Sequence, residues 1–155
     1  MRYVLDQAGT VTRFVARMIP HMSIRANTSA IGVLDNDNEL IAGLVYNYAM
    51  PSTGVMEVTI AALPGHLWLT RETLRIMIEY PFLQCGCQML ITFIRASDRR
   101  LLRQAAAVNC ALILFPRLFG RDEDGVIARL TKEDWEAGKY CRHRGIDTSA
   151  IGEAA

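Results

Sequence analysis

The sequence predicts an α+β fold in which a mixed, mainly antiparallel central sheet is flanked by helices. Two observations carry this prediction: three apolar strands follow one another through short turns in the first half of the chain, and helical and strand segments alternate in the second half. The chain has 155 residues, and 51% of them are hydrophobic, which is enough to bury the core of one domain.

The first half of the chain is organised by apolar spacing and by turn residues. Residues 3–6 form a short apolar strand, and residues 10–19 carry apolar side chains at helical spacing until Pro20 ends the helix. Asp and Asn at 35–38 tolerate the left-handed backbone of a hairpin turn. We therefore expect an antiparallel meander of three strands, at 29–34, 39–48 and 55–63.

The second half alternates between helical and strand patterns. A helix should end near Pro81, and Ser97 or Asp98 should cap the start of the next. The expected helices are 70–79, 98–108 and a short one beginning at 131–134. The expected strands are 89–94, 111–115 and 125–130.

Charge and hydropathy argue against two classes of partner. The formal net charge is +1 and no long basic run is present, so we expect no nucleic-acid surface. Four arginines that cluster locally are interpreted as a solvated helix face: Arg95, Arg99, Arg100 and Arg103. No apolar stretch approaches the about 20 residues that cross a bilayer, and the N-terminus lacks a signal-peptide pattern. We expect no membrane association and a cytoplasmic location.

The cysteines favour reduced thiols. Cys85 and Cys87 are separated by one residue, while Cys110 and Cys141 stand alone, so zinc-finger spacing is absent. No histidine in the sequence pairs with a cysteine or carboxylate motif, and we expect no metal site. Cys110 is interpreted as a small buried residue rather than a nucleophile.

The segment GHLWLTRETL, residues 65–74, is the most informative stretch of the chain. It follows a strand directly and opens an amphipathic helix. Such a junction exposes the free amides of a helix N-terminus, which favour anions such as phosphate groups. We therefore place a cofactor at this junction.

Three segments together resemble the GCN5-related N-acetyltransferases (GNAT), a superfamily of acyl-CoA transferases. GHLWLTRETLRIMIEYPF is similar to the family's Gly-rich turn, aromatic, small residue, Thr and helix. SDRRLLRQAAAVNCALILFPRL resembles the second block, and RDEDGVIARLTKEDW resembles the closing hairpin. The resemblance covers roughly residues 1–137, so residues 1–140 are expected to form one GNAT-like domain and residues 141–155 a polar tail.

The resemblance implies acetyl-CoA (CoA) as the acyl donor. Its pantetheine is expected to contact the main chain of Ala61, Ala62 and Leu63. The chain departs from the family pattern at Leu67, where a second glycine or alanine is usual, and at Asp98, where Asn is common. The remaining expected cofactor-binding residues are Gly65, His66, Leu67, Trp68, Leu69, Thr70, Arg71 and Asp98. For His66 and Arg71 a plain surface role stays open, Trp68 is also expected to pack the helix on the sheet, and Thr70 to cap it.

The implied reaction is direct attack of an amine on the thioester, which needs an N–H donor for the oxyanion and a base. Glu57 is the only ionisable residue of strand 55–63, and alternation puts it on the face of Val55, Thr59 and Ala61. We predict Glu57 as the base; the alternative is a solvated residue on an open sheet face. Tyr46 and Tyr48 are expected to pack, and helix 98–108 holds no Tyr to act as general acid.

The resulting hypothesis is an N-acetyltransferase that acts on a primary amine of a small molecule or peptide. Two alternatives remain open: an inactive GNAT-fold protein used for binding or assembly, and an acyl-CoA sensor. Acceptor residues are predicted by position alone, at His21, Arg25 and residues 122–124, where an acidic turn favours a cationic acceptor. Domains of this kind often dimerise, so we also expect a homodimer.

Overall fold

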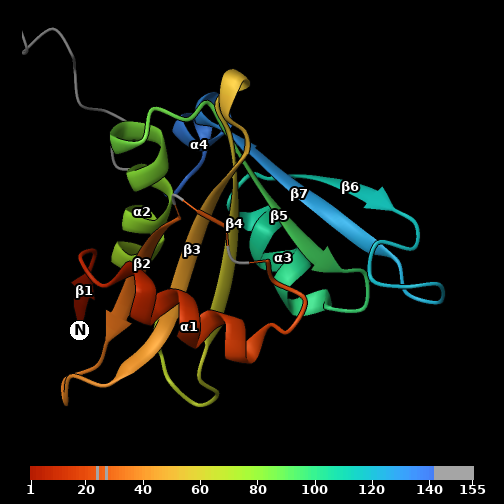
Figure 1. The fold of residues 1–155 in the computed structure, drawn as a ribbon. Helices are drawn as coiled ribbons and strands as arrows, with labels where there is room; N and C mark the ends of the chain where they lie inside the picture. Colours follow the sequence, from red (N-terminus) through yellow and green to blue (C-terminus); the bar gives the residue numbers. More distant parts are fainter. Residues whose placement is uncertain (24, 27, 142–155) are drawn as a thin grey trace, which may run out of the picture.

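The computed structural model describes residues 1–23, 25–26 and 28–141, and it confirms the predicted α+β fold (Figure 1). The strands are β1 (Arg2–Val4), β2 (Ser29–Leu34), β3 (Leu40–Met50), β4 (Val55–Ala62), β5 (Met89–Arg95), β6 (Ala111–Phe115) and β7 (Gly125–Thr131). The helices are α1 (Ala8–Met18), α2 (Arg71–Glu79), α3 (Arg99–Ala107) and α4 (Lys132–Ala137), with a 3-10 turn η1 (Pro51–Thr53) and a π turn η2 (Tyr80–Gln84). Apart from Cys141, the predicted tail at 141–155 lies outside the described residues.

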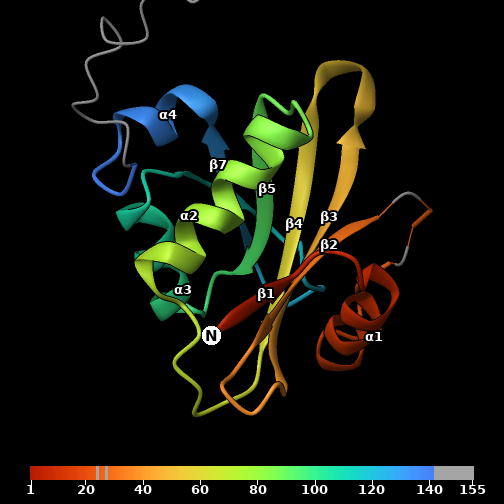
Figure 2. The same ribbon diagram turned by 90° about the vertical axis from the view of Figure 1, so that its left-hand side faces the viewer.

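The strands form one sheet in the order β1-β2-β3-β4-β5-β7-β6. Figure 2 shows α1 on one face of this sheet and α2 with α3 on the other. The larger buried cluster lies between the sheet and α2, and includes Tyr46, Met56, Met77 and Trp135. A smaller cluster lies under α1 and includes Val11, Val15 and Ala61. Two cores on opposite faces therefore hold the sheet in place.

β4 and β5 run parallel and separate soon after they begin. Within the described residues, positions 55–57 of β4 pair with positions 89–91 of β5, and the pairing ends there. Each strand keeps its antiparallel neighbour, β3 for β4 as far as Ala62 and β7 for β5 as far as Arg95. The sheet thus continues as two ribbons that diverge (Figure 1), and one edge of each inner strand is left unpaired.

Two glycines that face each other across β2 and β3 let α1 approach the sheet closely. Gly32 and Gly43 are partners in the register. A Cβ at Gly43 would lie 2.7 Å from Cγ2 of Val15, and one at Gly32 would lie 2.9 Å from Cγ2 of Val11. The absence of side chains at this pair sets how near α1, and the segment that follows it, can lie to β3.

Helix ends follow the predicted capping chemistry. Oγ1 of Thr70 accepts the N–H of Thr73 at 3.1 Å, and Oδ1 of Asp98 accepts the N–H of Leu101 at 3.0 Å. After α3 the chain turns at Asn109, whose φ of 79° lies in the left-handed region. Asn tolerates that region better than other side chains, so a helix end without glycine forms there.

Several boundaries differ from the prediction by one or two residues. β1 begins at Arg2 and ends at Val4, earlier than the predicted strand at 3–6, because the register with β2 ends where α1 approaches. The helix predicted to end near Pro81 continues into η2, where the N–H of Cys85 donates to the carbonyl of Tyr80 at 3.3 Å. Proline has no N–H to extend the α pattern, and the wider π turn buries Pro81 and Phe82 instead.

The far edge of the sheet is apolar and exposed. β6 is the last strand, and its large side chains Leu112, Ile113, Leu114 and Phe115 are between 42% and 61% exposed. α1 covers β2, β3 and β4, and no helix of the described residues lies over the same face of β5, β7 and β6 (Figure 1). Among the described residues, no helix is both long and apolar enough to span a bilayer.

The close approach of α1 to β3 predicts opposite effects on stability for Gly-to-Ala changes at Gly43 and at Gly9. Gly43→Ala should lower the free energy of unfolding by about 1–3 kcal/mol, because the added methyl overlaps Val15. Gly9→Ala, on the open side of α1 where the nearest atom is 3.7 Å away, should raise it by up to about 1 kcal/mol. Urea unfolding measures both, and equal effects of the two changes would contradict the close approach of α1.

Candidate functional site

A cavity of about 730 Å³ occupies the gap between β4 and β5. It passes from one face of the sheet to the other, because both faces contribute lining residues. On the α1 side these are Ile19, His21, Met22, Ser23, Arg25, Asn47, Glu57, Thr59, Ile91, Phe93, Arg95, Leu118 and Phe119. On the α2 and α3 side they include Ile60, Ala62, Trp68, Leu69, Met77, Leu90, Leu101, Gln104, Val108, Cys110 and Leu130.

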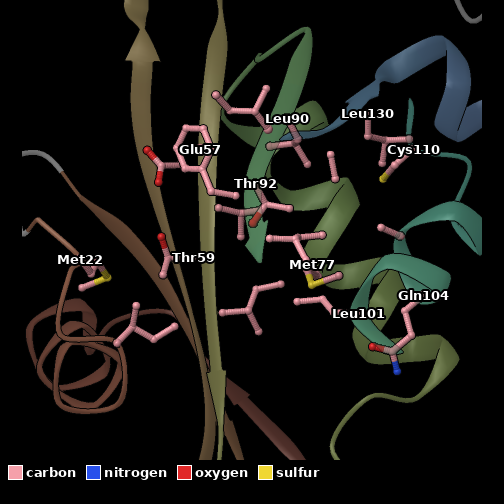
Figure 3. A pocket seen from close by; sticks show the side chains of 18 of the residues that line it. Met22, Glu57, Thr59, Met77, Leu90, Thr92, Leu101, Gln104, Cys110 and Leu130 are labelled. Atoms are coloured by element: carbon pink, nitrogen blue, oxygen red, sulfur yellow. The ribbon is translucent and has the colours of Figure 1, made fainter. Parts of the chain in front are cut away.

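The α2 and α3 side of the cavity is an apolar channel. Figure 3 shows Met77, Leu90 and Leu101 on this side of β4, with Gln104 and Cys110 toward α3. Burial raises the pKa of the Cys110 thiol to about 11, so the group is protonated at neutral pH. The thiol therefore behaves as the small apolar residue that the sequence indicated.

The main chain of β4 offers hydrogen-bonding groups to the gap at alternate residues. The N–H of Leu63 donates to the carbonyl of Ile41 at 2.8 Å, so it points to β3 and away from the gap. Because direction alternates along a strand, Ala61 also points to β3, and its side chain is buried in the cluster under α1. The amides of Ile60 and Ala62 therefore face the gap, and of the three expected main-chain contacts only Ala62 is placed for one.

The turn between β4 and α2 exposes a run of amides. Gly65 has a φ of +82° with open space around it, and the side chain of Leu67 is 82% exposed. Within the described part of the chain, the amides of residues 65–69 donate to no other main-chain group. The Leu67 side chain points away from the protein, so it does not fill the turn.

The other predicted cofactor residues are divided between the cavity and the surface. Trp68 and Leu69 line the cavity and pack against the larger core. His66 and Leu67 line a separate hollow of about 200 Å³ with Met1, Asp35, Asn36 and Ile41. Thr70 and Asp98 act as helix caps, and Arg71 is an exposed residue at the start of α2.

Glu57 lies half-buried on the α1 side of the cavity, on the face that strand alternation predicted. Figure 3 shows Glu57 and Thr59 extending from β4 in the direction of Met22. Burial raises the pKa of Glu57 above its ordinary value, and the charges of Arg25 and His21 offset part of that rise. A carboxylate with a raised pKa is a stronger base than a solvated one, so the open-face alternative does not describe this residue.

Asn47 is a neighbour of Glu57 that the sequence analysis missed. It is the cross-strand partner of Glu57, is buried, and accepts the hydroxyl of Thr28 at 2.7 Å through Oδ1. An asparagine directly after the run 40–46, inside a strand, was the signal in the sequence, and the register of the hairpin makes Asn47 a neighbour of Glu57.

The rim on the α1 side joins segments that are distant in the sequence. The rings of His21 and Phe119 meet edge to face at 5.5 Å, and Arg95 stacks on the same Phe119 ring at 4.6 Å. His21 and Arg25, which were predicted by position, both line the cavity. The acidic turn at 122–124 does not, which corrects its prediction, because Arg95 pairs with Glu123 there and Asp124 accepts the N–H of Arg117.

Tyr46 is buried, as expected, whereas Tyr48 is 37% exposed, so the packing prediction is right for Tyr46 and wrong for Tyr48. The hydroxyl of Tyr46 donates to the carbonyl of Met77 at 2.8 Å, and that of Tyr48 donates to the carbonyl of Cys85 at 3.0 Å. Neither ring lines the cavity. Among the described residues, His, Cys, Asp and Glu form no group of three or more that would hold a metal ion.

Comparison with solved structures identifies the fold. A mutant form of the spermidine/spermine N-acetyltransferase SpeG from Vibrio cholerae matches with a TM-score of 0.74 and 12% identity, covering 88% of this chain and 97% of the other. The same protein in complex with manganese ions gives 0.70 and 13%, with 88% and 94% covered. Its dodecameric structure gives 0.69 and 11%, with 86% and 95% covered. No protein-family model and no curated protein matches the sequence. The chain has the GNAT fold that the three sequence segments indicated.

The surroundings of Glu57 predict how its titration responds to substitution. Arg25→Gln should raise the pKa of Glu57 further, because it removes a positive charge that favours the carboxylate. An NMR titration of the side-chain carboxyl carbon measures this, with Arg99→Gln on the exposed face of α3 as the matched control. An unchanged or lowered pKa in the Arg25 variant would contradict the described geometry.

Proposed function

We propose that the protein is an acetyl-CoA-dependent N-acyltransferase that transfers an acetyl group to a primary amine. The observation that carries this proposal is the cavity through the sheet, which joins the apolar channel beside α2 and α3 to Glu57 on the opposite face. An acyl donor and an amine that enter from opposite faces would meet at the unpaired edge of β4.

The chain's residues fit an acyl-CoA at three places. The free amides of residues 65–69 suit a diphosphate, and the outward side chain of Leu67 leaves them accessible. The amides of Ile60 and Ala62 suit the pantetheine, which is itself built of amides. The apolar wall of Met77 and Leu101 suits its carbon chain.

Acetyl-CoA supplies a thioester, and the protein's part is to orient the amine and move its proton. Glu57 takes the proton from the amine, directly or through one water, as the new C–N bond forms. The amide of Ile60 or Ala62 donates to the carbonyl oxygen as negative charge develops on it. The C–S bond then breaks, and the proton held by Glu57 passes to solvent or to the departing sulfur.

Two other functions are compatible with this fold. An acyl-CoA sensor would use the channel and the turn without the base, and an inactive binding or assembly protein would use neither. Leu67 in place of a small residue favours these readings, whereas the half-buried Glu57 beside Arg25 favours the enzyme. Binding and turnover, measured separately, distinguish the three.

Acetyl-CoA binding should be measurable by calorimetry on the protein as it is, in the micromolar range of KM values usual for enzymes. Leu67→Gly should bind several-fold more tightly, because removal of Cβ lets the main chain approach a phosphate more closely. Leu83→Gly, at another exposed leucine, in η2, is the control and should leave affinity unchanged. No heat of binding with either the native protein or Leu67→Gly would favour the assembly protein.

Glu57→Gln should lower kcat by about 100-fold or more, the usual contribution of a general base. The native protein should gain activity with pH as Glu57 deprotonates, through a midpoint above the ordinary pKa of Glu because burial raises it. The variant should lose that limb of the pH profile, while Glu39→Gln, on the exposed hairpin, should keep it. A variant with native kcat and an intact limb would remove Glu57 from the mechanism.

We also propose that the protein forms a homodimer through the face of β6 and β7 that no helix covers. Ile113 and Phe115 are exposed there, and Phe93 and Ile127 lie beside them in the register. A row of unpaired strand groups with apolar side chains is a typical association surface. The neighbour SpeG has been solved as a dodecamer, which accords with association. The cytoplasmic location stays a prediction.

Light scattering should give about twice the chain mass of 17.3 kDa for the native protein. Ile113→Lys should halve that mass, because a charge in the apolar face opposes burial. Leu83→Lys, at an exposed leucine on the other side of the molecule, should remain a dimer. A native protein that is monomeric at high concentration would exclude this interface.

A further inference from the structure

Three of the four ionisable side chains that line the α1 side of the cavity within the described residues are basic. Among the described residues that line the cavity, Glu57 is the sole carboxylate, and it shares that side with Arg25, Arg95 and His21. The two residues left undescribed in the segment after α1 are Ile24 and Asn27, which are uncharged by sequence. The ionisable groups on the α1 side of the cavity are therefore the four side chains named above.

Arg25 is the cation with spare hydrogen-bonding capacity. Its Nη1 donates to the carbonyl of Tyr48 at 3.4 Å, and within the described part of the chain it joins no salt bridge. A guanidinium has five N–H donors in a planar fork that matches carboxylate and phosphate oxygens. Arg25 and Glu57 line the same side of the cavity, so the fork and the carboxylate can both contact one small molecule bound there.

The positive charge of Arg95 is balanced by a carboxylate of the acidic turn at 122–124. Arg95 pairs with Glu123 and stacks on Phe119, and the hydroxyl of Ser97 donates to the same carboxylate at 3.3 Å. Oδ1 of Asp124 is held by the N–H of Arg117 at 2.9 Å. Glu123 and Asp124 thus bind other groups of the protein and do not line the cavity. Neither is placed to receive a second ammonium group there.

We infer, on the basis of the proposed acyltransferase function, that the acceptor is an amine which also carries an anionic group, a carboxylate or a phosphate, with its amine at Glu57 and its anion at Arg25. Ile19, Met22 and Phe93 line the same side and provide apolar contact for the rest of the molecule. A polyamine would place a further ammonium near Arg25, where like charges repel. The preferred acceptor class therefore differs from the spermidine named for the structural neighbours.

The test compares acceptors in matched pairs with acetyl-CoA as donor. One pair is L-phenylalanine and L-phenylalaninamide, the other is O-phosphoethanolamine and ethanolamine, and spermidine is added alone. We expect kcat/KM for one anionic member to exceed that of its neutral partner by about tenfold or more, as charge-assisted hydrogen bonds give. The pair that shows the preference tells carboxylate from phosphate. The amide has the less basic amine, so its intrinsic reactivity at neutral pH works against the expected result.

Arg25→Gln should lower the ratio of the anionic to the neutral rate about tenfold, and Arg25→Lys should restore part of it. The ratio is used because loss of Arg25 also changes the pKa of Glu57, and that effect acts on both members alike. Arg99→Gln, on the exposed face of α3, should leave the ratio as it is.

Three results would overturn the inference and leave the acyltransferase standing: a preference for spermidine, a preference for the neutral members, or a ratio unaffected by Arg25→Gln. Transfer to none of these amines would count against the proposed function itself. In that case NMR titration of the same pairs decides: tighter binding of an anionic member that Arg25→Gln abolishes supports the inference, and equal binding within each pair overturns it.

Discussion

The separation of β4 from β5 is the constraint on which the site depends. A parallel pair that stayed bonded along its length would consume the main-chain groups of Ile60 and Ala62 and close the cavity. The sheet tolerates the gap because each strand is held by an antiparallel neighbour over its full length. The two ribbons are joined at one end, where the N–H of Gln88 donates to the carbonyl of Gly54 at 2.9 Å. The antiparallel pairs therefore stabilise the sheet, while the unpaired segments of β4 and β5 leave the cavity open.

The sheet also divides the chemistry between its two faces. On one face the channel is apolar, and burial there keeps the Cys110 thiol protonated. On the other face the same burial raises the pKa of Glu57, while Arg25 and His21 limit the rise. A carboxylate held between these influences is a stronger base than a solvated one. In the proposed mechanism the low-dielectric wall of the cavity therefore acts on the acyl donor at one face and on the proton transfer at the other.

Local chemistry made most of the fold predictable. Thr70 and Asp98 at helix starts and Asn109 at a helix end each act through neighbours a few residues away, so the sequence suffices to place them. The face of the sheet on which Glu57 lies was predictable because strand alternation is also local. The directions of the amides of Ala61 and Leu63 were not, since they depend on the register with β3. Asn47 beside Glu57, the pairing of Arg95 with Glu123 and the committed acidic turn arise from contacts across the fold, which spacing along the chain does not encode.

Phe119 has a consequence for how acceptor preference changes during evolution. Its ring touches His21 of the segment after α1 and Arg95 at the end of β5, so two segments far apart in the sequence share one support. A substitution in the hairpin between β6 and β7 that moves Phe119 also moves His21, on the opposite wall of the α1 side of the cavity. If the protein is the proposed acyltransferase, selection can change its acceptor preference through hairpin positions while Glu57 and the turn between β4 and α2 stay the same. The segment that would select the acceptor is thus separate in the sequence from the strand that would carry the proposed base.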